Sequence, residues 1–165
     1  MRITCQAQQT MACAPSAAFA LVVDPVRFPA TFTGYGPIPG IRAVTLDGPL
    51  AVDATRRIHN HDGSTLVETI TALDAPTHHA YSLGGFRPPF SWLVSRAEAD
   101  WTLQAGPSSS QVSWRYTFDV AHAWAYPLAA PLLRWCMARA MRRCLDNIAR
   151  LLEVPATATS AAGMH

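Results

Sequence analysis

The feature that most constrains the fold is a long amphipathic segment near the end of the chain, roughly residues 123–153. At about 100° per residue, one side of a helix over this segment carries Arg139, Arg142, Arg143, Asp146, Asn147, Arg150 and Glu153. The opposite side carries Leu133, Met137, Ala140, Met141, Cys144, Leu145, Ile148, Leu151 and Leu152. Such a helix rises about 1.5 Å per residue and can cross a small domain. Something broad and apolar must therefore cover it.

Before this segment the hydrophobic period shortens to two residues, which is typical of β-strands. We predict a first strand over 2–10 and six more over 41–46, 52–60, 64–72, 77–85, 94–105 and 111–120, separated by short turns rich in Gly, Pro and Asp. Two short helices are expected between the first and second strands, one over 15–23 and one that Asp24 caps and that runs to about Ala30. Short connections predict an antiparallel meander whose apolar face packs on the long helix.

Composition narrows the class of protein. The chain has 165 residues, 50% of them hydrophobic, which predicts one domain over 1–153 and a disordered Ala-, Thr- and Ser-rich tail over 154–165. Net charge is +2, and all 13 positive residues are arginines without a clustered block, so we expect no nucleic-acid partner. No apolar run suits a signal core or a membrane span, which predicts a cytoplasmic protein. No His and Cys spacing suits a metal site, and no cofactor is expected.

One hairpin places two charged residues on the inner face of the sheet. His61-Asp62-Gly63 fits a three-residue loop with Gly63 in the left-handed conformation. Arg56 then faces Glu68, on the same side as Val52, Ala54, Ile58, Leu66 and Ile70. Two interpretations remain open. The pair can orient a ligand in a cavity, with Glu68 as a base, or it can be a structural ion pair that touches no ligand.

Further candidates share the inner face. His79, Tyr81 and Leu83 lie on one side of their strand, where an ordinary core role competes with catalysis for His79. The other expected cavity residues are Trp101, Trp114, Tyr116 and Met137. Arg134 departs from the arginine stripe and is expected to point toward the apolar side, either at the rim or as an anion-binding residue. The aromatic, proline-rich loop 85–92 is expected at the cavity mouth, and loop 32–40 as a wall or lid.

The order of elements resembles the helix-grip fold of the SRPBCC superfamily (START-like domains), and in particular its bacterial polyketide cyclase/dehydrase-like branch. The segments that carry the resemblance are APSAAF (14–19), LVVDP (21–25), RFP (27–29), RRI (56–58), DG (62–63), VETI (67–70), LDAP (73–76) and VSW (112–114). The resemblance implies an α+β fold in which about seven antiparallel strands wrap around the long C-terminal helix. It also implies an apolar or aromatic ligand between sheet and helix, with Arg56 and Glu68 as recurrent inner polar residues.

Three functions follow as hypotheses. The first is binding of a small hydrophobic or aromatic ligand, lipid-like or polyketide-like, in the cavity. The second is an enzyme of the cyclase/dehydratase type, in which Arg56 stabilises an enolate while Glu68 or His79 moves protons. The third is a protein-interaction module that uses the proline-rich loops. Abundant inner aromatic residues and the absence of a recognised nucleophile–base pair favour binding, and the oligomeric state stays open.

Overall fold

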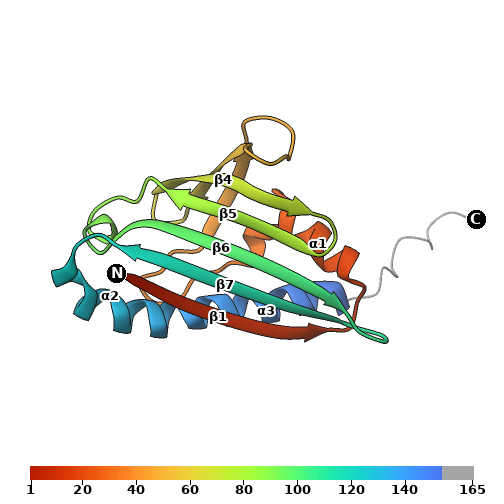
Figure 1. Cartoon of the computed structure of the whole chain (residues 1–165). Helices are drawn as coiled ribbons and strands as arrows, with labels where there is room; N and C mark the ends of the chain where they lie inside the picture. Colours follow the sequence, from red (N-terminus) through yellow and green to blue (C-terminus); the bar gives the residue numbers. More distant parts are fainter. Residues whose placement is uncertain (154–165) are drawn as a thin grey trace, which may run out of the picture.

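The computed structural model describes residues 1–153 and contains a seven-stranded antiparallel sheet with helical segments on one face (Figure 1). The strands are β1 (Arg2–Met11), β2 (Ile41–Leu46), β3 (Thr55–Asn60), β4 (Thr65–Asp74), β5 (His78–Gly84), β6 (Val94–Ala105) and β7 (Ser110–Val120). Their spatial order is β1-β7-β6-β5-β4-β3-β2, so β2 to β7 form the predicted meander and β1 pairs with β7. The predicted helix-grip α+β fold is confirmed. The tail predicted over 154–165 lies outside the described residues.

Alternation of apolar and polar side chains sets which face of each strand is buried. In β7, Trp114, Tyr116 and Phe118 are buried while Arg115 between them is exposed. Because successive strand residues point to opposite faces, the sheet has one apolar inner face and one polar outer face. The register of the β3–β4 hairpin is as predicted, with Arg56 opposite Glu68 and Gly63 at φ 83°.

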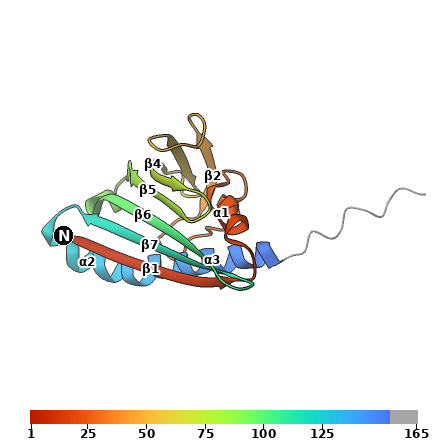
Figure 2. The same ribbon diagram turned by 45° about the vertical axis from the view of Figure 1, so that its right-hand side comes forward.

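The C-terminal helical segment is less regular than its sequence indicates. It consists of η3 (Ala123–Ala125), α2 (Tyr126–Leu132), a π-helical turn η4 (Leu133–Met137) and α3 (Ala138–Glu153). The α3 and η4 segments contact mainly β1, and the strands at the β2 edge stand away from the helix (Figure 2). The helix therefore covers only part of the inner sheet face.

The π-helical turn explains a wrong prediction. A π turn takes more residues than an α turn, so it shifts the face that the preceding residues present. Arg134, which a uniform 100° spacing turns toward the sheet, is exposed, and its guanidinium Nη2 donates to the Tyr126 hydroxyl at 3.4 Å. Leu151 was also placed on the buried side, but it is 44% exposed near the end of the helix.

Two further boundaries differ from expectation. Helix α1 (Pro15–Val23) is as predicted, but only a 3₁₀ turn, η1 (Phe28–Ala30), follows it. The Asp24 carboxylate accepts from the backbone N–H groups of Val26 and Arg27, which supports this turn. Strand β3 begins at Thr55 rather than at residue 52, because Asp53 has φ 67° and Val52 points into solvent.

Candidate functional site

A cavity of about 410 Å³ opens between the sheet, the helical segment and three connecting loops. It is lined by Phe28, Phe32, Pro37, Ile38, Pro39, Ile41, Ile58, Asn60, Asp62, Gly63, Ser64, Leu66, Tyr81, Leu83, Phe86, Arg87, Pro88, Pro89, Phe90, Leu93, Trp114, Tyr116, Phe118, Leu132 and Met137. Most of these side chains are apolar, and the volume lies in the range that holds a drug-sized molecule.

The mouth of the cavity is made of loops. Asp62 and Gly63 at the tip of the β3–β4 hairpin, Pro37, and residues 87–89 all line the cavity and are exposed to solvent. The proline-rich loop 85–92 thus lies where the sequence predicted, and loop 32–40 contributes Phe32 and Ile38 as a wall. At its other side, loop 32–40 approaches η4 so closely that a Cβ on Gly36 would lie 3.4 Å from the Cys136 sulfur.

Two tryptophans on neighbouring strands differ in their access to the cavity. Trp101 and Trp114 face each other across β6 and β7 and stack with ring centroids 4.1 Å apart and an interplanar angle of 18°. Trp114 lines the cavity, whereas Trp101 does not and is fully buried, with the Phe28 ring nearly perpendicular to it at a centroid distance of 6.2 Å. The direct ligand contact expected of Trp101 is therefore not available in this conformation.

Two tyrosines supply polar groups to a largely apolar wall. Tyr81 on β5 and Tyr116 on β7 both line the cavity, with ring centroids 6.3 Å apart and nearly perpendicular planes. Burial raises the pKa of each phenol, and the negative charge of Glu68 raises it further. Both hydroxyls are thus protonated at neutral pH and can donate to a ligand carbonyl or hydroxyl oxygen.

Behind the tyrosines lies a second, smaller cavity of about 40 Å³. Tyr81, Tyr116, Leu83, Phe28, Ile41 and Ile58 line both spaces. Arg56, Glu68 and Asp24 line only the smaller one. The predicted inward pair is therefore present, but a layer of apolar and phenolic side chains separates it from the main cavity.

The charged pair is tightly joined. The Arg56 Nε donates to Glu68 Oε1 at 2.7 Å, and Arg56 Nη2 contacts the same oxygen. The two side chains are only 6% and 4% exposed. Burial raises the pKa of Glu68, and the neighbouring Arg56 charge opposes that shift. Among residues 1–153 no hydrogen bond uses Glu68 Oε2, which leaves this oxygen as the acceptor available to the small cavity.

His79 completes an inner polar cluster, by which we mean Arg56, Glu68 and His79. Its Nδ1 lies 3.3 Å from the Ala72 carbonyl oxygen, and its Nε2 lies 3.3 Å from Arg56 Nη2. A neutral ring with the proton on Nδ1 satisfies both contacts. Burial and the Arg56 charge lower the pKa of His79 to about 4. His79 lines neither cavity, and its place beside Arg56 suits orienting the guanidinium more than contacting a ligand.

Of the two helix residues predicted at the site, one lines the cavity and the other does not. Met137 at the end of η4 lines the cavity. Arg134, one turn earlier, lies outside the lining and is exposed. The lining residues that the sequence prediction did not name individually are mostly in connections between strands, such as Phe86, Pro88 and Phe90, while Asn60 ends β3. Their aromatic and turn-forming composition was the available signal, but it does not show which side chains point inward.

Other classes of site find no support in the part of the chain that the structure describes. No group of three or more His, Cys, Asp or Glu residues there is placed to hold a metal ion. The cysteines are free; Cys5 and Cys144 are buried, while Cys13 and Cys136 are partly accessible. In residues 1–153, no helix has the length and apolar character needed to cross a membrane.

Comparison with known proteins agrees with this architecture. A family model described as polyketide cyclase/dehydrase and lipid transport matches residues 2–153, nearly the whole described chain. The chain belongs to this family. No curated protein sequence matches it.

Several solved structures are similar in fold to the chain over most of its length. The ZhuI aromatase/cyclase of Streptomyces sp. R1128 aligns with a TM-score of 0.73 and 14% identity, covering 93% of this chain and 94% of that one. Truncated norcoclaurine synthase of Thalictrum flavum gives 0.70 and 12%, covering 93% and 95%. The protein Ara h 8.0201 gives 0.63 and 14%, covering 92% and 98%. At these identities the likeness establishes the fold alone.

Proposed function

We propose that the protein binds a small hydrophobic or aromatic ligand, lipid-like or polyketide-like, in the main cavity. The observation that carries this proposal is the cavity itself, about 410 Å³ of mostly apolar wall with a solvent-exposed rim. Apolar walls with a few placed polar groups are typical of small-molecule sites. Here Tyr81 and Tyr116 supply hydroxyls in an otherwise apolar surface, which suits a flat or aliphatic molecule with one carbonyl or hydroxyl group.

The proposal is tested by filling the cavity. Leu66 on β4 lines it, while Val67, the next residue, points out and is 43% exposed. An apolar fluorescent dye, anilinonaphthalene sulfonate, is titrated into the wild type, Leu66→Trp and Val67→Trp. We expect saturable binding that Leu66→Trp weakens at least about tenfold, because the indole occupies ligand space, and that Val67→Trp leaves unchanged. Absence of saturable binding, or equal effects of the two substitutions, would contradict the proposal.

An enzyme of the cyclase/dehydratase type is the second candidate. The observation that favours it is the small cavity, where Tyr81 and Tyr116 meet Arg56 and Glu68. A substrate carbonyl seated at the tyrosines would have donors for a developing enolate, and Glu68 Oε2 would be the base. Against it stands the pairing of Glu68 with Arg56, which leaves the carboxylate little freedom.

Glu68→Gln separates the two candidates. The carboxamide keeps an oxygen that can accept from Arg56 but cannot remove a proton. An aryl β-diketone is offered as substrate to wild type and variant, and its ultraviolet absorbance is followed. Consumption by the wild type that Glu68→Gln abolishes, with dye affinity retained, would establish the enzyme. Equal consumption by both proteins would exclude Glu68 as the base, and no consumption by either would favour binding.

A further inference from the structure

Large apolar side chains gather on the surface at one end of the molecule. Trp92, Trp124, Leu128 and Trp135 are 58%, 62%, 61% and 60% exposed; we call this set the tryptophan end. Three of the four, Trp124, Leu128 and Trp135, come from the helical segment formed by η3, α2 and η4. In the same segment Ala125, Ala129 and Leu133 are buried. The exposed side chains are therefore apolar without being part of the core.

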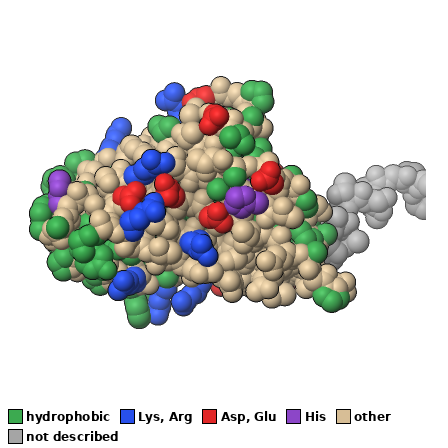
Figure 3. All heavy atoms as spheres, viewed as in Figure 1, with side chains coloured by type: hydrophobic (Ala, Val, Ile, Leu, Met, Phe, Trp, Pro, Cys, Tyr) green, Lys and Arg blue, Asp and Glu red, His purple; other side chains and the backbone are tan. Residues whose placement is uncertain are grey.

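The fourth side chain comes from a different part of the chain. Trp92 belongs to η2 (Phe90–Trp92), directly before β6. The following residue, Leu93, accepts from the Ala121 backbone N–H at 2.9 Å, which joins this loop to the start of the helical segment. The loop before β6 and α2 lie at the same end of the molecule in both ribbon views (Figures 1 and 2). Figure 3 shows hydrophobic side chains gathered at this end.

The surface beside the tryptophan end is positively charged. Between Val120 and Leu145 the sequence has no Asp or Glu and four arginines: Arg134, Arg139, Arg142 and Arg143. Within residues 1–153 none of these four makes an ion pair; Arg134 donates to the Tyr126 hydroxyl, Arg139 to the Tyr35 hydroxyl and Arg143 to the Gly34 carbonyl oxygen. Figure 3 shows arginines along the lower edge next to the apolar end. The Arg139 guanidinium lies over the Trp135 ring at 4.3 Å, so a cation stands directly beside an exposed indole.

The exposed apolar side chains and the neighbouring arginines together favour an anionic membrane as the partner. Exposed Trp and Leu beside arginines match the composition of segments that lie in the interface of an anionic membrane, where indoles settle at headgroup depth. We propose that the tryptophan end docks on an anionic lipid membrane surface. The indoles and Leu128 enter the interface, and the four arginines face lipid phosphates and carboxylates.

Docking in this orientation would place the cavity mouth near the lipid. Pro88, Pro89 and Phe90 of the cavity lining immediately precede Trp92, and Leu132 lies between Leu128 and Trp135. A membrane-dissolved ligand could then enter without crossing water. This consequence rests on the proposed ligand-binding function, whereas docking itself does not require the cavity.

The test is flotation of the intact protein with vesicles of phosphatidylcholine containing about one part in four of phosphatidylserine, compared with phosphatidylcholine alone. We expect binding to the anionic vesicles that falls with added salt. The double substitution Trp124→Ser/Trp135→Ser should reduce the partition coefficient at least about tenfold. Val26→Ser, which changes the 84%-exposed Val26 in the turn after α1, is the matched control and should have no effect.

Charge is tested separately. Arg142→Gln and Arg143→Gln should each weaken vesicle binding about fivefold, whereas Arg115→Gln, on the exposed outer face of β7, should not. Leu66→Trp should lose dye binding yet float with vesicles like the wild type, so failure of the cavity and failure of docking are distinguishable. Equal partition onto both vesicle types, or no binding, would overturn the proposal. It would equally be overturned by light scattering that shows a dimer converted to monomer by Trp124→Ser/Trp135→Ser, because the partner would then be a second copy.

Discussion

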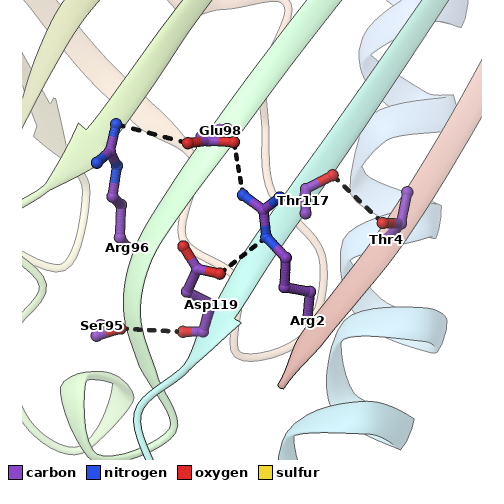
Figure 4. A network of polar contacts seen from close by, with 7 residues as sticks. All are labelled: Arg2, Thr4, Ser95, Arg96, Glu98, Thr117 and Asp119. Atoms are coloured by element: carbon purple, nitrogen blue, oxygen red, sulfur yellow. Dashed lines mark hydrogen bonds and ion pairs between the residues drawn. The ribbon is translucent and has the colours of Figure 1, made fainter.

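The two faces of the same sheet carry ion pairs of the same chemistry in opposite surroundings. On the outer face, Arg2 bridges Glu98 at 2.6 Å and Asp119 at 2.9 Å, and Arg96 lies 3.5 Å from Glu98 (Figure 4). These side chains are between 36% and 55% exposed. On the inner face, Arg56 and Glu68 are only 6% and 4% exposed.

Solvation decides what each group of charges contributes. Water screens the outer pairs, and exposed ion pairs contribute at most about 1 kcal/mol each. The inner pair has lost its hydration, which costs several kcal/mol per ion, so an apolar replacement of both residues would often be as stable. The inner pair is thus poorly explained by stability alone, and its place at the small cavity beside Tyr81 and Tyr116 supplies another reason for it.

The largest expected effect comes from breaking the inner pair. Glu68→Leu leaves the Arg56 guanidinium buried without its carboxylate, and we expect a loss of about 3–5 kcal/mol in the free energy of unfolding. Urea denaturation measures this value. The double substitution Arg56→Met/Glu68→Leu removes both charges and should recover most of the loss. A single substitution that costs less than about 1 kcal/mol would mean that water reaches Arg56 freely.

A pH series provides the second test. The pKa of His79 is lowered to about 4 in the folded chain, against about 6.5 when unfolded. The unfolded chain therefore binds a proton first, and stability falls as pH decreases from about 6.5 to about 4, by up to roughly 3 kcal/mol. Urea denaturation of wild type and His79→Gln across this range isolates the effect. Glu68 is present in both proteins, so the difference between them removes its contribution. That contribution has the opposite sign, because the pKa of Glu68 is raised in the folded chain.

If the advantage of the wild type over His79→Gln does not shrink as the solution is acidified, His79 is already charged or solvated in the native state. The proposed role of its neutral ring in positioning Arg56 would then be wrong. The opposite result would show that the inner polar cluster titrates as a buried unit.

The smallest effect is expected on the outer face. Arg2→Ala removes two ion pairs, yet the free energy of unfolding should fall far less than for Glu68→Leu, because all partners remain hydrated. Added salt should shrink the difference further. Thermal and urea denaturation at low and high salt measure it. A loss as large as that of Glu68→Leu would show that the two faces are less different than their exposure indicates.

Local rules predicted much of the inner face. The hairpin with Gly63 set the register that opposes Arg56 to Glu68, since a turn of known length leaves no freedom in the pairing. Period-two alternation placed His79, Tyr81, Trp101, Trp114 and Tyr116 inside. The same alternation could not show that Trp114 lines the cavity while Trp101 does not, because both lie on the inner face of their strands. Phe28 packs on Trp101 and Phe32 packs on Trp114, both from segments more than 70 residues away, and strand periodicity does not record such contacts.

The other wrong prediction concerned which side of the helical segment each residue faces. Arg134 was placed inward on the assumption of a uniform helix, and nothing in residues 133–137 announces a π turn. Such a turn depends on how the two halves of the helix pack, which periodicity does not record. Loop side chains such as Phe86 and Phe90 were likewise beyond prediction, because turn-forming composition gives no direction to a ring.

The π turn η4 joins α2 to α3 and sets which side of each helix faces the sheet. A π turn holds one residue more than an α turn, so the residues before it are turned by about 100° from the positions that a uniform α-helix of the same sequence would give them. After η4, Met141, Cys144 and Leu145 of α3 are buried. Before η4, Trp124 and Leu128 are exposed. Deleting one residue within 133–137 would return this turn to α-helical spacing and would keep Ala129 inward and Trp124 outward, because the π turn already absorbs the extra residue. The wide turn thus brings Ala125, Ala129 and Leu133 onto the same buried side that Met141 and Cys144 continue in α3.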